Sequence, residues 1–222
     1  MKILIFDSGP LINLSMNGLL YILEALKKEF NGKFIITEQV KYEVIDRPIK
    51  VPKFELGALQ IKELISSNIL ELPSSIGIGS DIIKKETQFL MKKANTCMMA
   101  GDKQINIVSE AEISCLAVSA ELAKRNVENI IAIDERTTRI LTENPKDLER
   151  LMSNKLHMRV NLNYDATFKN FKFIRSTELV YVAFKKGILK VKGPKVLEAA
   201  LYATKFKGSS VSFEEIAILK KL

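Results

Sequence analysis

The chain has 222 residues, of which 47% are hydrophobic and 27% are charged, and its formal net charge is +8. This length and apolar content suffice to bury one core, which argues against disorder, and no apolar run approaches the roughly 18 residues that cross a membrane. With one histidine and two cysteines, the chain lacks the residues for a multi-histidine metal site or a disulfide framework. Because the N-terminus also lacks a secretory signal pattern, we expect a soluble, cytoplasmic protein without a membrane partner.

Short apolar runs alternate with helical patterns in the first half of the chain. Continuous apolar runs are typical of parallel strands that are covered on both faces, whereas apolar residues three and four apart indicate helices. In chain order, the predicted elements are a strand at residues 2–6, a strand at residues 34–36, a helix from Thr37 to Arg47, a mainly helical segment at residues 46–100 with a loop at residues 72–80, and a weak strand at residues 105–108.

The second half continues the alternation and then becomes helical. Ser109 and Glu112 have the spacing of a capping box, which predicts the start of a helix. The predicted elements are a helix at residues 110–124, a buried strand at residues 129–133, a helix from Asp134 onward, and tail helices at residues 177–186, 196–205 and 212–221. Alternating strands and helices predict an α/β fold with a central, mostly parallel sheet.

Four acidic residues stand where a strand-like run meets a helix-like run. In open α/β sheets, sites form at the carboxyl ends of the strands, so these side chains are expected to share one edge. Clustered carboxylates repel one another unless a cation neutralises them, and oxygen ligands suit hard cations such as Mg²⁺ or Mn²⁺. The candidate metal-binding and catalytic residues are Asp7, Glu43, Glu112 and Asp134.

Each acid also has a purely structural interpretation. Asp7 and Asp134 have the position of helix N-caps, and Glu112 has the capping-box position opposite Ser109. Glu43 lies in an early helical turn, where a solvated glutamate is common. Because neighbouring acids are too close in sequence to be excluded, the secondary candidates are Glu110 and Glu135.

The excess positive charge lies in the C-terminal third of the chain. Residues 151–222 contain 14 lysines and arginines against 5 acids, whereas the first 150 residues are nearly neutral. Lysine-rich segments attract phosphate backbones, although they are also common as solvated surfaces. The candidate nucleic-acid contacts are Lys185, Lys186, Lys190, Lys192 and Lys195.

Four segments together resemble the ordered motifs of the PIN-domain nucleases. They are ILIFDSGPLINL, ITEQVKYEV, VSEAEISCLAVSAEL and IIAIDERTTRIL, and they span most of residues 1–145. The resemblance implies a Rossmann-like α/β/α sandwich in which Asp7, Glu43, Glu112 and Asp134 bind the metal. It also implies that the hydroxyl of Ser8 supports the site. Glu112 departs from the aspartate more usual in the family, which leaves Glu110 as a competitor.

The resemblance implies a Mg²⁺- or Mn²⁺-dependent endoribonuclease that hydrolyses RNA. We expect a nuclease domain at residues 1–150 with a helical insertion at about residues 46–100, and a basic, helical extension at residues 151–222. The family also suggests a homodimer and an antitoxin-like protein partner. One alternative is an RNA-binding scaffold with an inactive metal site. Another is an aspartyl-phosphate phosphatase, which would need an aspartate where the chain has Gly9.

Overall fold

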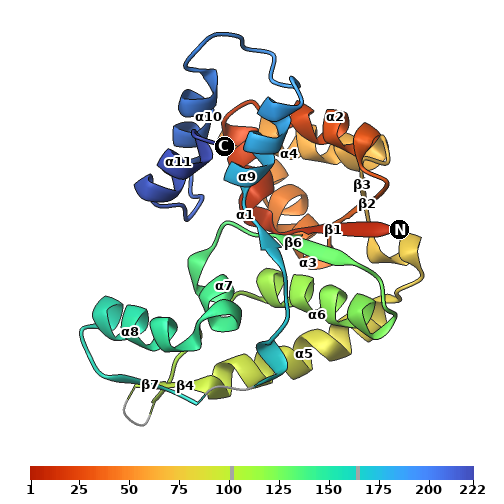
Figure 1. Cartoon of the computed structure of the whole chain (residues 1–222). Helices are drawn as coiled ribbons and strands as arrows, with labels where there is room; N and C mark the ends of the chain where they lie inside the picture. Colours follow the sequence, from red (N-terminus) through yellow and green to blue (C-terminus); the bar gives the residue numbers. More distant parts are fainter. Residues whose placement is uncertain (101–102, 164–165) are drawn as a thin grey trace.

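A parallel β-sheet forms the centre of the molecule (Figure 1). The computed structural model describes residues 1–100, 103–163 and 166–222. Within these ranges the sheet has five strands, all paired in parallel. From one edge to the other they are β3 (Leu70–Glu71), β2 (Gly32–Ile35), β1 (Lys2–Phe6), β6 (Asn129–Ala132) and β8 (Phe173–Ile174). The predicted α/β class is therefore confirmed.

The chain builds this sheet outward from β1 in both directions. It adds β2 and β3 on one side and then returns to add β6 and β8 on the other. The direction reverses between β1 and β6, which are neighbours in a register that pairs Leu4 with Ile130 and Phe6 with Ala132. Ligands of open α/β sheets bind outside the carboxyl ends of the strands at such a switch point. Functional side chains are therefore expected directly after β1 and β6.

Helices cover both faces of the sheet (Figure 1). One face carries α1 (Ser8–Met16), α2 (Tyr21–Glu29), α4 (Pro52–Ser66) and α9 (Ser176–Lys185), and the other carries α5 (Ser80–Cys97) and α6 (Glu110–Lys124). Because both faces are covered, Ile5 and Phe6 of the central strand are completely buried. The rings of Phe6 and Phe34 meet edge to face with centroids 5.4 Å apart, which fixes β1 against β2.

Residues 46–100 are mainly helical, as predicted, and they also supply one strand of the central sheet. After the short helices α3 (Glu38–Lys41), η1 (Tyr42–Asp46) and η2 (Pro48–Lys50), α4 is the crossover that returns the chain to the sheet as β3. Strand β3 pairs with β2 through Phe34–Leu70 and Ile35–Glu71. Strand β3 itself was not predicted, because a strand of two residues has no periodic pattern to detect.

A small antiparallel sheet lies at the end of α5, away from the central sheet (Figure 1). Its strands within the described ranges are β4 (Met98–Ala100), β5 (Lys103–Gln104) and β7 (Val160–Leu162). Residues 105–108, which the structure describes, do not form the weak strand that was predicted. Ile105 N–H nevertheless donates a hydrogen bond to the Met98 carbonyl. Helices α7 (Arg136–Glu143) and α8 (Pro145–Leu156) connect the two sheets.

The three predicted tail helices are confirmed. They are α9, α10 (Val196–Phe206) and α11 (Phe213–Leu219), and α11 opens on the expected capping box of Ser212 and Glu215. Strand β8 and α9 join the central layers, whereas α10 and α11 enclose a separate apolar cluster of Leu201, Val211 and Ile216. No helix in the described ranges is long and apolar enough to cross a membrane.

A chain ending at residue 163 is expected not to fold cooperatively. The truncation removes β8 and α9, which leaves the edge of β6 unpaired and removes the buried Leu179 and Val180 from the core. Urea unfolding followed by circular dichroism checks this expectation. The control chain ends at residue 212 and should keep a single, weaker transition, because it loses only α11. A cooperative transition of wild-type midpoint in the shorter chain would contradict the prediction.

Candidate functional site

Asp7 follows β1 directly and is a buried acid with an incomplete set of partners. It is the N-cap of α1, as one interpretation predicted, and its Oδ2 accepts a hydrogen bond from Gly9 N–H at 3.3 Å. Its other oxygen, Oδ1, is buried and accepts no hydrogen bond from any described residue. The residue is only 4% exposed. The cap therefore accounts for one carboxylate oxygen and not for the other.

Burial and neighbouring charge act together on Asp7. The pKa of Asp7 is raised from 3.8 to about 7, chiefly by burial and also by the negative charges of Glu112 and Glu43, while the backbone N–H groups of Ser8 and Gly9 act in the opposite direction. Three of the four predicted acids are thus electrostatically coupled. A buried acid with a strongly shifted pKa is more often functional than an ordinary one.

Glu43 reaches this region from η1, which follows β2. Ser8 Oγ donates a hydrogen bond to Glu43 Oε2 at 2.6 Å, and Ser8 is itself buried. This bond joins the first turn of α1 to η1, elements that follow neighbouring strands of the sheet. The structure therefore places Ser8 in contact with one of the candidate acids, Glu43.

Glu112 satisfies both of its sequence interpretations at once. It forms the capping box with Ser109 at the start of α6, as predicted, and its Oε2 also accepts a hydrogen bond from Thr138 Oγ1. Burial raises the pKa of Glu112, and the charge of Glu135 raises it further. Thr138, which lies in the first turn of α7, was not among the predicted residues.

The structure places Asp134 in a different role from the predicted N-cap. Glu135 caps α7 instead, accepting from Thr138 N–H at 3.0 Å. Asp134 Oδ1 accepts from Ser176 N–H at 2.8 Å, and its Oδ2 accepts from Asn13 Nδ2 at 3.1 Å. Burial nevertheless raises the pKa of Asp134, because these hydrogen bonds offset only part of the desolvation. Both carboxylate oxygens of Asp134 therefore have protein partners.

Asp7 and Asp134 lie on either side of Gly9. A Cβ atom on Gly9 would be 3.5 Å from Asp7 Oδ2 and 3.5 Å from Asp134 Cβ. The carboxyl ends of β1 and β6 therefore bring these two acids together, as the switch point predicts. Glu110 points elsewhere. It is exposed, accepts a hydrogen bond from Gln39 Nε2 at 3.2 Å, and lines a pocket of about 320 Å³ beside α5.

The acids fit a hard cation in chemistry but not in their present orientation. Their oxygen donors suit Mg²⁺ or Mn²⁺, and the unpartnered Asp7 Oδ1 is free to accept a ligand. Within the described ranges, however, no three histidine, cysteine, aspartate or glutamate side chains are arranged to hold a metal ion. Glu43 is turned to Ser8, and Glu112 is turned to Ser109 and Thr138.

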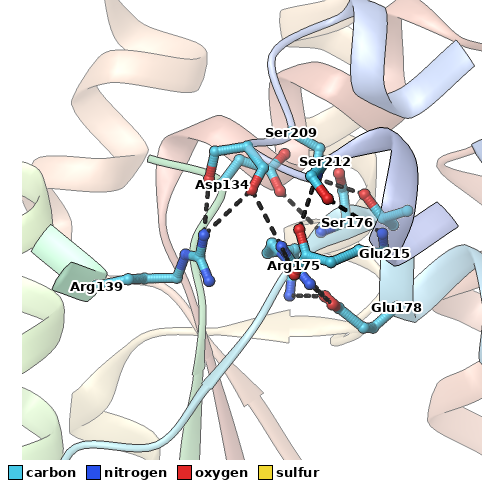
Figure 2. Close-up of polar contacts among 10 residues, drawn as sticks. Asp134, Arg139, Arg175, Ser176, Glu178, Ser209, Ser212 and Glu215 are labelled. Atoms are coloured by element: carbon cyan, nitrogen blue, oxygen red, sulfur yellow. Dashed lines mark hydrogen bonds and ion pairs between the residues drawn. The ribbon is translucent and has the colours of Figure 1, made fainter. Parts of the chain in front are cut away.

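A polar network ties Asp134 to the C-terminal helices (Figure 2). The backbone N–H of Ser210 donates to the Asp134 carbonyl at 3.1 Å. The Ser210 carbonyl accepts from Arg139 Nη2 at 3.2 Å and from Arg175 Nη1 at 3.0 Å. Arg175 also pairs with Glu178 and Glu215. The turn between α10 and α11 is therefore held by two arginines and by the backbone of a candidate site residue.

Sequence reasoning missed Asn13 and Arg175. Asn13 Nδ2 donates to Asp134 Oδ2 and also to the Thr204 carbonyl at 2.8 Å, so it bridges the candidate site and α10. An asparagine inside the apolar run of α1 was a usable signal, because a buried amide needs partners. No local pattern marks Arg175, whose partners lie on α9, α11 and the turn before α11.

The structure does not bring the five predicted lysines to the acids. They lie on α9 and the loop before α10, at the top of the view in Figure 1, away from the carboxyl ends of β1 and β6. Four of them have partners: Lys185 with the Leu222 carbonyl, Lys186 with Glu29, Lys190 with the Tyr21 ring, and Lys192 with the Gly187 carbonyl. Lys195 is exposed at the start of α10.

Comparisons of the chain with protein-family models, with curated proteins and with solved structures find no match. The class of the protein therefore rests on its fold and site alone. It is an α/β protein with buried carboxylates at the switch point of a parallel sheet.

Replacing Asp7 by asparagine should remove a pH-dependent loss of stability. Between pH 3.8 and about 7 the folded chain binds the Asp7 proton and the unfolded chain does not, so stability falls as the pH rises through this window. Without divalent cations, the free energy of unfolding of Asp7→Asn should therefore rise relative to that of the wild type by about 3 kcal/mol between pH 5 and pH 8. Urea unfolding at both pH values measures this difference.

The control for that measurement is Asp81→Asn, which changes an exposed acid at the start of α5. Its stability should change with pH in parallel with the wild type. A parallel change for Asp7→Asn as well would show that Asp7 titrates normally.

Proposed function

We propose that this protein is a Mg²⁺- or Mn²⁺-dependent endoribonuclease of the PIN-like type, acting in the cytoplasm. The observation that carries the proposal is Asp7. One of its oxygens is buried at the switch point of the sheet and accepts no hydrogen bond from the described residues. The negative charges of Glu112 and Glu43 raise its pKa. A divalent cation would neutralise this cluster, as a proton does at low pH.

In this proposal, Asp7, Glu43 and Glu112 hold the cation, and Asp134 supports it from across Gly9. When bound, such a cation acidifies a coordinated water and stabilises negative charge on the phosphate oxygens. Ser8 orients Glu43, and Thr138 orients Glu112. Asn13 and the Ser176 N–H fix the Asp134 carboxylate. Glu135, whose charge acts on Glu112, is the supporting acid, whereas Glu110 points away from the site.

RNA is the proposed substrate because the excess charge of residues 151–222 attracts phosphate. A homodimer and an antitoxin-like protein partner belong to the same proposal through the motif resemblance. Residues 1–150 would then carry the catalytic acids, and the C-terminal extension would complete the sheet with β8 and support Asp134 through Ser176.

Asp7→Asn should abolish metal-dependent cleavage of RNA. Purified protein is incubated with a labelled, mixed-sequence RNA and Mn²⁺, Mg²⁺ or a chelator. Mutating a residue that only hydrogen-bonds to a metal ligand typically lowers activity by about 10- to 100-fold. Loss of a ligand itself should therefore slow cleavage by more than about 100-fold. Asp81→Asn should cleave at the wild-type rate. Cleavage that survives both the chelator and Asp7→Asn would refute the assignment.

One observation favours a second function, an RNA-binding scaffold without catalysis. Glu43 and Glu112 are already hydrogen-bonded to hydroxyl groups, and the described acids do not form a ready metal site. A scaffold would need no cation. Thermal unfolding with and without Mn²⁺ therefore separates the two proposals.

For the nuclease, saturating Mn²⁺ should stabilise the wild type but not Asp7→Asn. Binding to the folded state alone contributes about 2.7 kcal/mol at a cation concentration of about 100 times Kd. The rise in the unfolding temperature of wild type, Asp7→Asn and Asp81→Asn is compared in one experiment. Equal responses of all three chains would place any bound cation elsewhere and favour the scaffold.

A further inference from the structure

Three aromatic rings form a row on the outside of the C-terminal helices. Tyr202 and Phe206 are stacked on α10, with centroids 6.2 Å apart and ring planes 20° apart, and Phe213 of α11 lies 6.1 Å from Tyr202. Phe206 is 73% exposed and Phe213 is 54% exposed. A stable fold gains little from such exposed rings. Tyr202 is partly buried against the apolar cluster of these helices, but the exposure of Phe206 and Phe213 beside it needs another explanation.

Lysines accompany the rings. Lys205 lies over the Phe213 ring, with its Nζ 4.4 Å from the centroid, and Lys207 is exposed with no ion-pair partner in the described ranges. The neighbouring acids are Glu214, which is exposed at the start of α11 near Lys205, Glu215, which pairs with Arg175, and Glu198, which pairs with Lys220. Positive charge and flat apolar surface therefore occur together on this face. Here this combination is called the aromatic row, meaning Tyr202, Phe206 and Phe213 with Lys205 and Lys207.

The aromatic row is joined to the candidate site by two hydrogen bonds. The Thr204 carbonyl, which directly precedes Lys205 and Phe206, accepts from Asn13, the partner of Asp134 Oδ2. Ser210, in the turn after Lys207, donates its N–H to the Asp134 carbonyl. In Figure 1, α10 and α11 lie above α7, beside the ends of β1 and β6. The row is therefore tied directly to the carboxyl edge of the sheet, where the acids lie.

We infer that the aromatic row binds single-stranded RNA and presents it to the acids, an inference that rests on the proposed function. Proteins that bind single strands combine aromatic rings, on which bases stack, with a basic groove that follows the backbone. A second copy of this chain is a poorer occupant, because a two-fold contact pairs the same patch with itself and would bring the lysines of both copies into one interface. The RNA contact surface is thus α10–α11 and not residues 185–195.

The test measures RNA binding without cleavage. Fluorescence anisotropy with a short, mixed-sequence, single-stranded RNA is recorded in chelator for wild type, Phe206→Ala and Lys207→Gln. Phe206→Ala should weaken binding by about ten-fold, because stacked bases lose their support. Lys207→Gln should lower the slope of log affinity against log salt by about one.

Two matched controls separate this surface from the rest of the chain. Phe89→Ala removes another exposed ring that lies beside a lysine, 5.8 Å from Lys93 Nζ on α5. Lys190→Gln removes a lysine of the C-terminal loop. Both variants should bind RNA within about two-fold of the wild type, and circular dichroism should show all four variants folded.

Several outcomes would overturn the inference. Unchanged affinity in Phe206→Ala with a loss in Lys190→Gln would assign binding to the loop. A dimer by light scattering that Phe206→Ala converts to a monomer, with RNA affinity unchanged, would make the row a self-contact. Because binding is measured in chelator, it is tested separately from cleavage. If the wild type cleaves RNA but Phe206→Ala binds RNA with unchanged affinity, the aromatic row is refuted and the nuclease is not. If Phe206→Ala loses affinity and the wild type does not cleave RNA, the aromatic row is supported and the nuclease is refuted.

Discussion

The arrangement of the molecule depends on the hydrogen bonds that Asp134 accepts. The Asp134 carboxylate accepts one hydrogen bond from the first N–H of α9 and another from Asn13 on α1. Its own backbone carbonyl accepts from Ser210, in the turn between α10 and α11. Segments that are far apart in the sequence are therefore held at one residue. Buried charge of this kind is tolerated because its hydrogen bonds are complete on both oxygens.

Asp7 is a buried carboxylate of the same kind, but its set of hydrogen bonds is incomplete within the described residues. Both acids follow central strands, both are buried, and both flank Gly9. Asp134 has a donor for each oxygen, whereas one oxygen of Asp7 accepts no hydrogen bond from the part of the chain that the structure describes, and Asp7 lies near the charges of Glu43 and Glu112. An unsatisfied buried acid destabilises a fold, so its persistence at a switch point favours a role in binding or chemistry. The contrast separates the acid that organises the structure from the acid that is available to a ligand.

Local patterns predicted much of this fold, and long-range contacts account for what was missed. The apolar run of β1, the capping boxes at Ser109 and Ser212, and the tail helices are encoded within a few residues of sequence. Strands β3 and β8 have two residues each, too few for a period, and they exist because a neighbouring strand accepts them.

The same distinction holds within the candidate site. The positions of Asp7 and Glu112 follow from the ends of a strand and of a helix. The partners of Asp134 are 121 and 42 residues away, at Asn13 and Ser176, and no spacing rule connects them. The N-cap role predicted for Asp134 belongs to Glu135 because the Asp134 carboxylate is already occupied.

The late position of β8 in the chain has a consequence for biosynthesis. Strand β6 lies between β1 and β8, so one side of it has no partner until residues 173–174 have been made. During translation the nascent chain therefore exposes a parallel strand edge and an unsatisfied Asp134, both of which favour contacts with other chains. The central sheet therefore cannot be completed until β8 and α9 have been synthesised, which leaves the earlier strands exposed to such contacts for most of translation.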